Sequence, residues 1–220
     1  MSMAGTSDGL TERKELDTAD KMIEQEIFPA LILEDNPNLD VKAMNDYAYE
    51  LRKKGKVHKN QYASNIGGEH SFYVNLKEPV LQPLIKCITK MSYAYSKRLA
   101  VKEELTLAIS NMWFIINNYK DHNTQHTHPG AYLSGAFYSK AGENCGNLVF
   151  KDPNPRLESY WWSDYFKHTT NFYSPIRNFK PQTNRIIIFP AWLEHYVRPN
   201  ETKEDRIAWS FNLQLVEGNK

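Results

Sequence analysis

The chain has 220 residues, of which 41% are hydrophobic and 13% aromatic, and its 27 basic and 26 acidic side chains leave a formal net charge of +1. This length allows one sizeable core and is short for two ordinary domains, and the balanced charge argues against nucleic acid or an anionic membrane as the main partner. No apolar run approaches the ~20 residues that cross a bilayer and no signal-like segment begins the chain, so we expect a cytoplasmic protein.

The first part of the chain predicts a tail followed by a strand. Residues 1–20 are polar and charged, and we interpret them as a flexible tail before a single domain over 21–220. A β-like run over 27–33 is interrupted by Pro29, which suits an edge strand.

Two helices are predicted next. Asn38 or Asp40 can cap a helix that runs to about Lys54 and ends at Gly55, because apolar residues recur in it at helical spacing. A second helix with one apolar face is expected from about residue 78 to 99. The glycine-containing segment 64–71 between them is expected to be a loop.

After about residue 104 the chain becomes rich in β-branched and aromatic residues. Turn residues and a polar loop at 120–125 separate its strand-like runs, which lie at 106–119, 131–139, 147–151, 185–189 and 206–215. We therefore expect a mainly β fold with flanking helices, in which 21–104 is a helical support region and 105–216 forms the β-core. The two cysteines, Cys87 and Cys145, are expected to be free thiols.

A long connection from about Asn154 to Gln182 joins two core strands and carries an aromatic cluster that includes Trp161 and Trp162. Connections of this length inside a compact β-core usually have a function, and aromatic side chains bring much contact area. We interpret the segment as a mobile cover that helps to select the substrate. The alternative is that these rings only cap the β-core.

Three histidines form a candidate metal site. His126 and His128 are two residues apart, and on a strand such residues share a face. His195 comes 67 residues after His128, following a strand and a proline-containing bend. A single histidine is more often structural, but if the two strand ends are neighbours, three imidazoles converge. Three protein ligands with open positions suit a metal that activates O2.

Arg206 is the candidate anion-binding residue. It begins a strand with large apolar side chains on one face and polar residues, including Ser210, on the other. Arginine can bind a carboxylate through two charge-assisted hydrogen bonds. Arg206 follows His195 by 11 residues, which suits a dicarboxylate that chelates the metal at its other end. The alternative is a surface salt bridge with Glu204 or Asp205.

In this order, the motifs resemble those of the 2-oxoglutarate/Fe(II)-dependent dioxygenase superfamily, and most of all its small bacterial and phage-type group related to prolyl hydroxylases. The resemblance covers residues 111–213 and rests on five segments: His126–Pro129, Leu133–Tyr138, Gly146–Phe150, Phe189–His195 and Arg206–Asn212. Each segment alone is unspecific, whereas the ordered set is specific.

The resemblance implies a double-stranded β-helix, the jelly-roll fold that cupins share. It also implies Fe(II) bound by His126, His128 and His195, 2-oxoglutarate bound by Arg206, and O2 as co-substrate. Tyr119, Asn111 and Ser210 are further candidates for binding the same carboxylate. The chain departs from the family at His128, where most members have Asp or Glu. A neutral imidazole leaves the site one negative charge short, which bound 2-oxoglutarate would supply.

The implied reaction is hydroxylation of a peptidyl or small-molecule substrate with release of succinate and CO2, and no catalytic side chain is needed beyond the metal centre. Two other classes stay open. One is a cupin-like metalloenzyme with a three-histidine site that does not use 2-oxoglutarate, and the other is a non-catalytic binding protein on the same fold. The sequence leaves open the substrate and whether the chain forms a homodimer.

Overall fold

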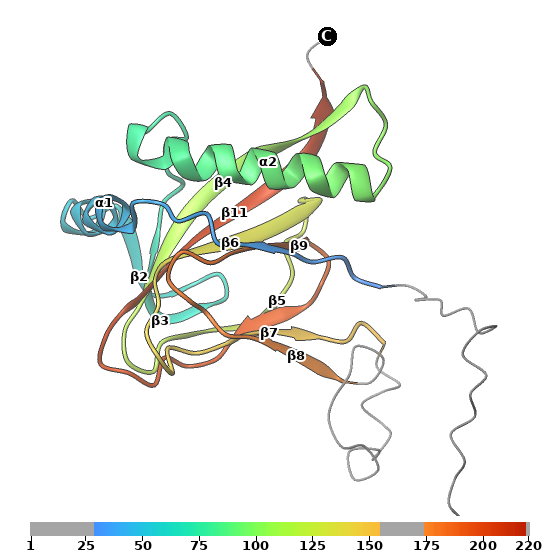
Figure 1. The fold of residues 1–220 in the computed structure, drawn as a ribbon. Coiled ribbons are helices and arrows are strands. Elements are labelled where there is room, and N and C mark those ends of the chain that lie inside the picture. Colours follow the sequence, from blue (N-terminus) through green and yellow to red (C-terminus); the bar gives the residue numbers. More distant parts are fainter. Residues whose placement is uncertain (1–28, 155–173, 219–220) are drawn as a thin grey trace, which may run out of the picture.

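The computed structural model describes residues 29–154 and 174–218, which form an antiparallel sheet with two helices on its outside (Figure 1). The helices are α1 (Val41–Lys53) and α2 (Gln82–Arg98), and a short 3-10 turn (Pro79–Leu81) precedes α2. The first six strands are β1 (Leu33–Asp35), β2 (Val57–Tyr62), β3 (Asn65–Ser71), β4 (Leu105–Asn117), β5 (His122–His126) and β6 (Leu133–Lys140). The others are β7 (Leu148–Lys151), β8 (Ile176–Phe179), β9 (Ile186–Pro190), β10 (His195–Val197) and β11 (Arg206–Glu217).

The described strands form one curled sheet in the order β1-β9-β6-β11-β4-β3-β5-β10-β7-β8, with β2 paired to β3. All of these strand pairs are antiparallel. Strands β4, β6 and β11 make one layer, and β5, β7, β8 and β10 make a second layer opposite it (Figure 1). This is the predicted double-stranded β-helix, and it brings strands that are far apart in sequence to face one another.

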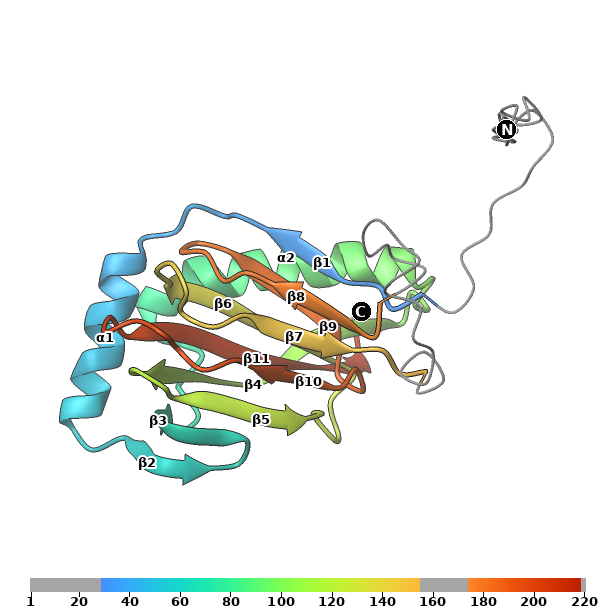
Figure 2. The same ribbon diagram turned by 90° about the horizontal axis from the view of Figure 1, so that it is seen from below.

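The main core lies between α2 and the outer face of β4 and β11. Alternate residues of β11, including Trp209 and Phe211, are fully buried there against Phe114 of β4 and Leu84 of α2. Because side chains alternate along a strand, the intervening residues of β4 and β11 face the second layer. Burying each large apolar side chain contributes about 1.5–3 kcal/mol, so this core fixes the register that positions the inner face. Figure 2 shows α1 at one end of the strands and α2 behind them.

Both predicted helices are confirmed. Asp40 caps α1, because its side chain accepts a hydrogen bond from the Ala43 N–H at 3.2 Å. Gly55 follows α1 with a φ of 69°, a left-handed conformation that glycine adopts without strain. The predicted free thiols are also confirmed. Within the described ranges, no helix is both long and apolar enough to cross a membrane.

Two predicted loops are wrong. Residues 65–71 form β3, which pairs with β2, β4 and β5, and the polar segment at 122–126 forms β5. Strand pairing on both sides outweighs the low strand propensity of Gly67 and Gly68. A Cβ on Gly68 would lie 2.5 Å from Asn117 Nδ2 and 2.8 Å from the Ile116 carbonyl oxygen, so glycine permits this close approach. The region expected to be helical support therefore also contributes β1, β2 and β3.

Two other boundaries differ from expectation. The first strand, β1, is shorter and later than the predicted run over 27–33, and it pairs with β9. The connection predicted over 154–182 contains β8, which pairs with β7. Residues 155–173 of that connection, with Trp161 and Trp162, lie outside the described residues, as does the predicted tail over 1–20.

Candidate metal centre

The three predicted histidines meet at one point between the two layers of the sheet. His126 ends β5 and His195 begins β10, and these two residues are partners across the antiparallel β5–β10 pair. Their ring centroids are 4.3 Å apart, and the ring of His128 lies 5.2 Å from each. One nitrogen from each ring lies within 4.8 Å of the others. His128 comes just after β5 rather than on it, so the turn as well as the strand brings the rings together.

Two of the three rings are oriented by the backbone. The Nδ1–H of His126 donates to the Thr124 carbonyl oxygen at 2.7 Å, and the Nδ1–H of His195 donates to the Leu193 carbonyl oxygen at 2.8 Å. A carbonyl oxygen only accepts, so Nδ1 carries the proton and Nε2 offers its lone pair. Metal-binding histidines are commonly oriented by this arrangement.

His128 is oriented by a side chain instead. Its Nδ1–H donates to Asn212 Oδ1 at 2.8 Å, and the Ser134 hydroxyl donates to the same oxygen at 2.7 Å. The Nε2 atom of His128 is buried and has no hydrogen-bond partner. A buried polar atom without a partner is costly, and a metal ion at the meeting point of the rings would supply one.

The three imidazoles are held in their neutral form. Burial lowers the pKa of His126, and burial together with the neighbouring imidazoles lowers the pKa of His128 to about 4 and that of His195 to about 3. Metal ligation requires neutral imidazole, so at pH 7 these rings need not lose a proton to bind an ion. The trio also brings no negative charge to the site.

A cavity of about 360 Å³ extends from the histidines, lined by the inner faces of both layers. Arg206, Ser210 and Asn212 line it from β11, and Trp113 and Asn117 line it from β4. Arg206 is the only Lys, Arg, Asp or Glu among the described residues that line it. The cavity thus joins a group of neutral imidazoles to one fixed positive charge.

Arg206 is 1% exposed and has only neutral hydrogen-bond partners. Its Nη1 donates to the carbonyl oxygens of Cys145 and, at 3.0 Å, Gly146, and its Nη2 donates to Asn117 Oδ1 at 2.7 Å. Burial lowers the pKa of Arg206, but a guanidinium starts so high that it keeps its proton. A buried cation without a carboxylate is costly, so the site favours an anionic ligand.

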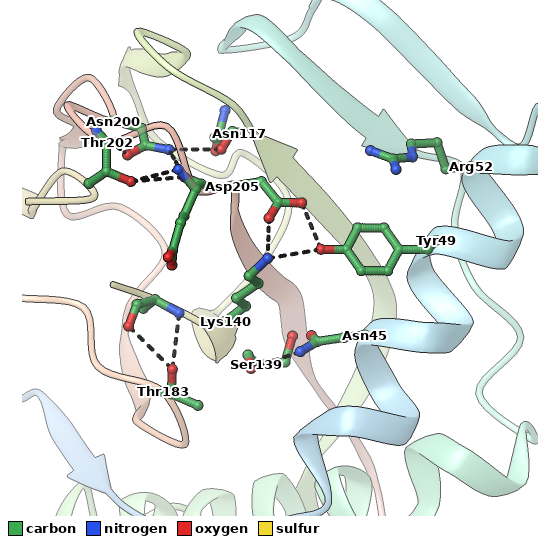
Figure 3. A network of polar contacts seen from close by, with 12 residues as sticks. Asn45, Tyr49, Arg52, Asn117, Ser139, Lys140, Thr183, Asn200, Thr202 and Asp205 are labelled. Atoms are coloured by element: carbon green, nitrogen blue, oxygen red, sulfur yellow. Dashed lines mark hydrogen bonds and ion pairs between the residues drawn. The ribbon is translucent and has the colours of Figure 1, made fainter. Parts of the chain in front are cut away.

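The alternative of a surface salt bridge at Arg206 is wrong. The Asp205 carboxylate instead pairs with Lys140 Nζ and accepts a hydrogen bond from the Tyr49 hydroxyl at 2.7 Å (Figure 3). These contacts keep the chain at Asp205 toward α1, while the next residue, Arg206, turns into the cavity.

The other predicted carboxylate-binding residues lie in different places. Ser210 lines the cavity. Tyr119 comes after the end of β4, is 55% exposed and lies under Lys120 Nζ, outside the lining. Asn111 is the strand partner of Asn212, and its buried Oδ1 has no hydrogen-bond partner, but it does not line the cavity either.

An aromatic wall in the same cavity was missed by sequence reasoning. The wall consists of Tyr62, His70, Tyr73 and Trp113. The Trp113 ring stacks on His128 at 5.8 Å, and the His70 ring stacks on Trp113 at 5.7 Å. Alternation of side chains along the predicted strand over 106–119 is the one signal that could have indicated the side on which Trp113 lies. The other three belong to the β2–β3 hairpin and the residues after it, where no strand β3 was expected.

Comparison with known proteins agrees with this geometry. A family model described as 2OG-Fe(II) oxygenase matches residues 111–212. No curated protein matches the chain. Among solved structures, a Pseudomonas putida prolyl-4-hydroxylase has a TM-score of 0.56 at 11% identity, covering 83% of this chain and 91% of its own.

Two further structures are also similar in fold. A Trichoplax adhaerens prolyl hydroxylase, solved with a peptide fragment of hypoxia inducible factor, has a TM-score of 0.59 at 14% identity, with 83% of each chain covered. The epimerase SnoN from nogalamycin biosynthesis has a TM-score of 0.61 at 11% identity, covering 86% of this chain and 79% of its own. At these identities the structures support the fold, and the family model carries the assignment. Residues 111–212, which hold the three histidines and Arg206, match the family of 2-oxoglutarate/Fe(II)-dependent oxygenases, whose members are enzymes that use Fe(II), 2-oxoglutarate and O2.

Proposed function

We propose that this enzyme hydroxylates a C–H bond of a peptidyl or small-molecule substrate and releases succinate and CO2, with its metal bound by His126, His128 and His195. The observation that carries the proposal is the pairing, in one cavity, of three inward-facing neutral imidazoles with a buried arginine that has no carboxylate partner among the described residues.

The imidazole trio suits an Fe(II) ion that must also bind other ligands. Its protein ligands leave positions free for a chelating cofactor and for O2. With both bound, O2 would be the oxidant: two of the four electrons that it accepts would come from the oxidative decarboxylation of 2-oxoglutarate and two from the substrate C–H bond. The protein's own part is to hold the rings at fixed tautomers and to keep the site largely out of water.

Arg206 is the proposed binding residue for the distal carboxylate of 2-oxoglutarate, with Ser210 on the same face of β11. A dicarboxylate that reaches from the histidines would remove the uncompensated charge at Arg206. Tyr119 and Asn111 remain weaker candidates, because both lie outside the lining of the cavity.

The aromatic wall is the proposed substrate side of the cavity. Tyr62 and Tyr73 are 42% and 69% exposed, and exposed aromatic rings beside a cavity are typical of a binding surface. Burial lowers the pKa of His70, so this wall is neutral at pH 7 and suits an uncharged part of the substrate. The Trichoplax adhaerens enzyme was solved with a peptide and SnoN belongs to nogalamycin biosynthesis, so relatives in fold support both substrate classes.

A three-histidine metalloenzyme that does not use 2-oxoglutarate is the second candidate, favoured by the His128 departure alone. It gives no reason for an uncompensated Arg206 in the same cavity. Anaerobic addition of Fe(II) and 2-oxoglutarate separates the two, because chelation gives a visible metal-to-ligand charge-transfer band. Absence of the band, together with turnover that does not depend on 2-oxoglutarate, would contradict the proposal.

A further inference from the structure

Asn117 is the strand partner of Arg206 across the β4–β11 pair and is 1% exposed. Its Oδ1 accepts a hydrogen bond from Arg206 Nη2 at 2.7 Å. On its other side, Asn117 Nδ2 donates to Asn65 Oδ1 at 3.2 Å. An amide that donates on one side and accepts on the other has only one orientation, so the oxygen of Asn117 is fixed toward the guanidinium.

Asn65 is fixed in the same way. It is 1% exposed, and its Nδ2 donates to the Gly68 carbonyl oxygen at 2.7 Å. The donors therefore all run in one direction, from Arg206 to Asn117 to Asn65 to the Gly68 backbone. Gly68 itself packs against the two amides, since a Cβ there would lie 2.5 Å from Asn117 Nδ2 and 3.0 Å from Asn65 Oδ1. The backbone of Asn117 is also held, because its carbonyl oxygen accepts a hydrogen bond from Asn200 Nδ2 at 3.1 Å (Figure 3).

This chain of amides orients Arg206 without neutralising it. An aspartate at position 117 could accept the same hydrogen bond, but it would add a negative charge beside the guanidinium and could not donate to Asn65. The carboxylate of Asp121 acts on Arg206 only at longer range, and its Oδ2 accepts the Asn118 N–H at 2.7 Å. The neutral partner at position 117 leaves the charge of Arg206 available to a ligand.

We infer that Asn117 is a positioning residue for the anion site: it orients the Arg206 guanidinium toward the distal carboxylate of 2-oxoglutarate and, being uncharged, preserves its positive charge for that carboxylate. The inference rests on the proposed function. It assigns to Asn117 a role that a merely structural amide would not have, because replacing that amide with a carboxylate would preserve the contact with Arg206 and yet weaken the binding of 2-oxoglutarate.

The test is calorimetric titration of 2-oxoglutarate, without O2, into the full chain loaded with Mn(II). Asn117→Asp is expected to weaken 2-oxoglutarate binding on the order of 10- to 100-fold while Mn(II) affinity stays unchanged. Asn117→Ala, which removes the contact and adds no charge, is expected to weaken it less. Asn118→Asp makes the same chemical change one residue along, at an exposed position, and is expected to bind like the wild type.

The outcomes are separable. Wild-type affinity in Asn117→Asp, with binding lost in Arg206→Ala, overturns the inference alone. A wild-type protein that does not bind 2-oxoglutarate overturns the proposed function and the inference with it. If Asn117→Asp does not fold, Asn65→Ala carries the test, because it frees the Asn117 amide to rotate without adding charge. A severalfold loss of 2-oxoglutarate affinity then supports the inference, and an unchanged affinity overturns it.

Discussion

Burial has opposite effects on charge at the two ends of the cavity, the end with the three histidines and the end with Arg206. At the histidine end, burial removes charge, because the lowered pKa values keep the three rings neutral. At the Arg206 end, burial leaves the charge in place, because a guanidinium cannot give up its proton, and the surrounding acceptors are carbonyl and amide oxygens. Among the described lining residues, neither end supplies a negative charge. The protein thus leaves charge neutralisation to the ligand.

The contrast explains why a third histidine is compatible with this site. With Asp or Glu at position 128, the protein would supply one negative charge to the metal. With His128, a dianion that touches both ends would offset two of the three positive charges that the metal and Arg206 carry together. Mutations at the histidine end should therefore reduce metal binding, and mutations at the Arg206 end should reduce 2-oxoglutarate binding without affecting the metal. The predictions below test this from the largest expected effect to the smallest.

The largest effect is expected at the histidine end. Replacing His126, His128 or His195 with alanine should remove most of the bound Fe(II), because each ring would supply one of the three proposed protein ligands. The measurement is iron content after anaerobic loading and desalting, with far-UV circular dichroism as the check on folding. A His128→Ala protein that keeps full iron and full activity would show that the third ligand lies elsewhere.

Removing the charge at the other end should affect the cofactor and spare the metal. Arg206→Ala is expected to raise the apparent dissociation constant for 2-oxoglutarate about tenfold to a hundredfold, since a hydrogen bond to a charged group is worth roughly 1.5–3 kcal/mol. Iron content should stay at the wild-type level. Ser210→Ala, on the same strand face, is the milder comparison. Loss of iron in Arg206→Ala would mean that the two ends are not independent.

The sequence predicted much of the site but not its supports. Arg206 and Ser210 were placed by strand alternation, and the structure has both in the cavity lining. Tyr119 was placed by analogy and lies past the end of β4, in a turn whose course the sequence did not indicate. Asn117 was missed because its role depends on strand register: it faces Arg206 only because β4 pairs with β11 over their whole length.

The fold was predictable where hydrophobic alternation was strong. Strands such as β4, β9 and β11 match their predicted runs to within one or two residues, because their apolar faces pack on the core. Strands β3 and β5 were not predicted, since polar residues and glycines dominate them and pairing with neighbours on both sides stabilises them. The support for the anion site, through Asn65 and Gly68, lies in one of these unpredicted strands.

A smaller loss of Fe(II) affinity is expected when the hydrogen bond that fixes the tautomer of His128 is removed. Asn212→Ala removes the acceptor that holds the Nδ1–H of His128, and a loss of about tenfold in Fe(II) affinity is expected, within the range found for residues that support metal ligands. Asn212→Asp keeps an acceptor in the same place and should retain binding. Equal loss in both variants, measured by competition with a metal chelator, would mean that Asn212 acts through packing alone.

The smallest effect is expected outside the cavity, at the contact between α1 and the start of β11. The Tyr49 hydroxyl donates to Asp205 Oδ2 at 2.7 Å and accepts from Lys140 Nζ at 3.2 Å (Figure 3). Tyr49→Phe removes both contacts and leaves the Lys140–Asp205 ion pair in place, so a loss of about 1 kcal/mol in the free energy of unfolding is expected.

The control for this change is on the same helix. The Tyr47 ring stacks on Trp209 at a centroid distance of 6.3 Å, and Tyr47→Phe keeps that stacking, so a smaller loss is expected. Urea denaturation of both variants, beside titrations of Fe(II) and 2-oxoglutarate, gives the comparison. Since Asp205 directly precedes Arg206, unchanged 2-oxoglutarate affinity in Tyr49→Phe would show that the orientation of the guanidinium depends on its own partners at Asn117, Cys145 and Gly146. A loss of affinity comparable to that of Asn117→Ala would extend the support of the anion site outward to α1.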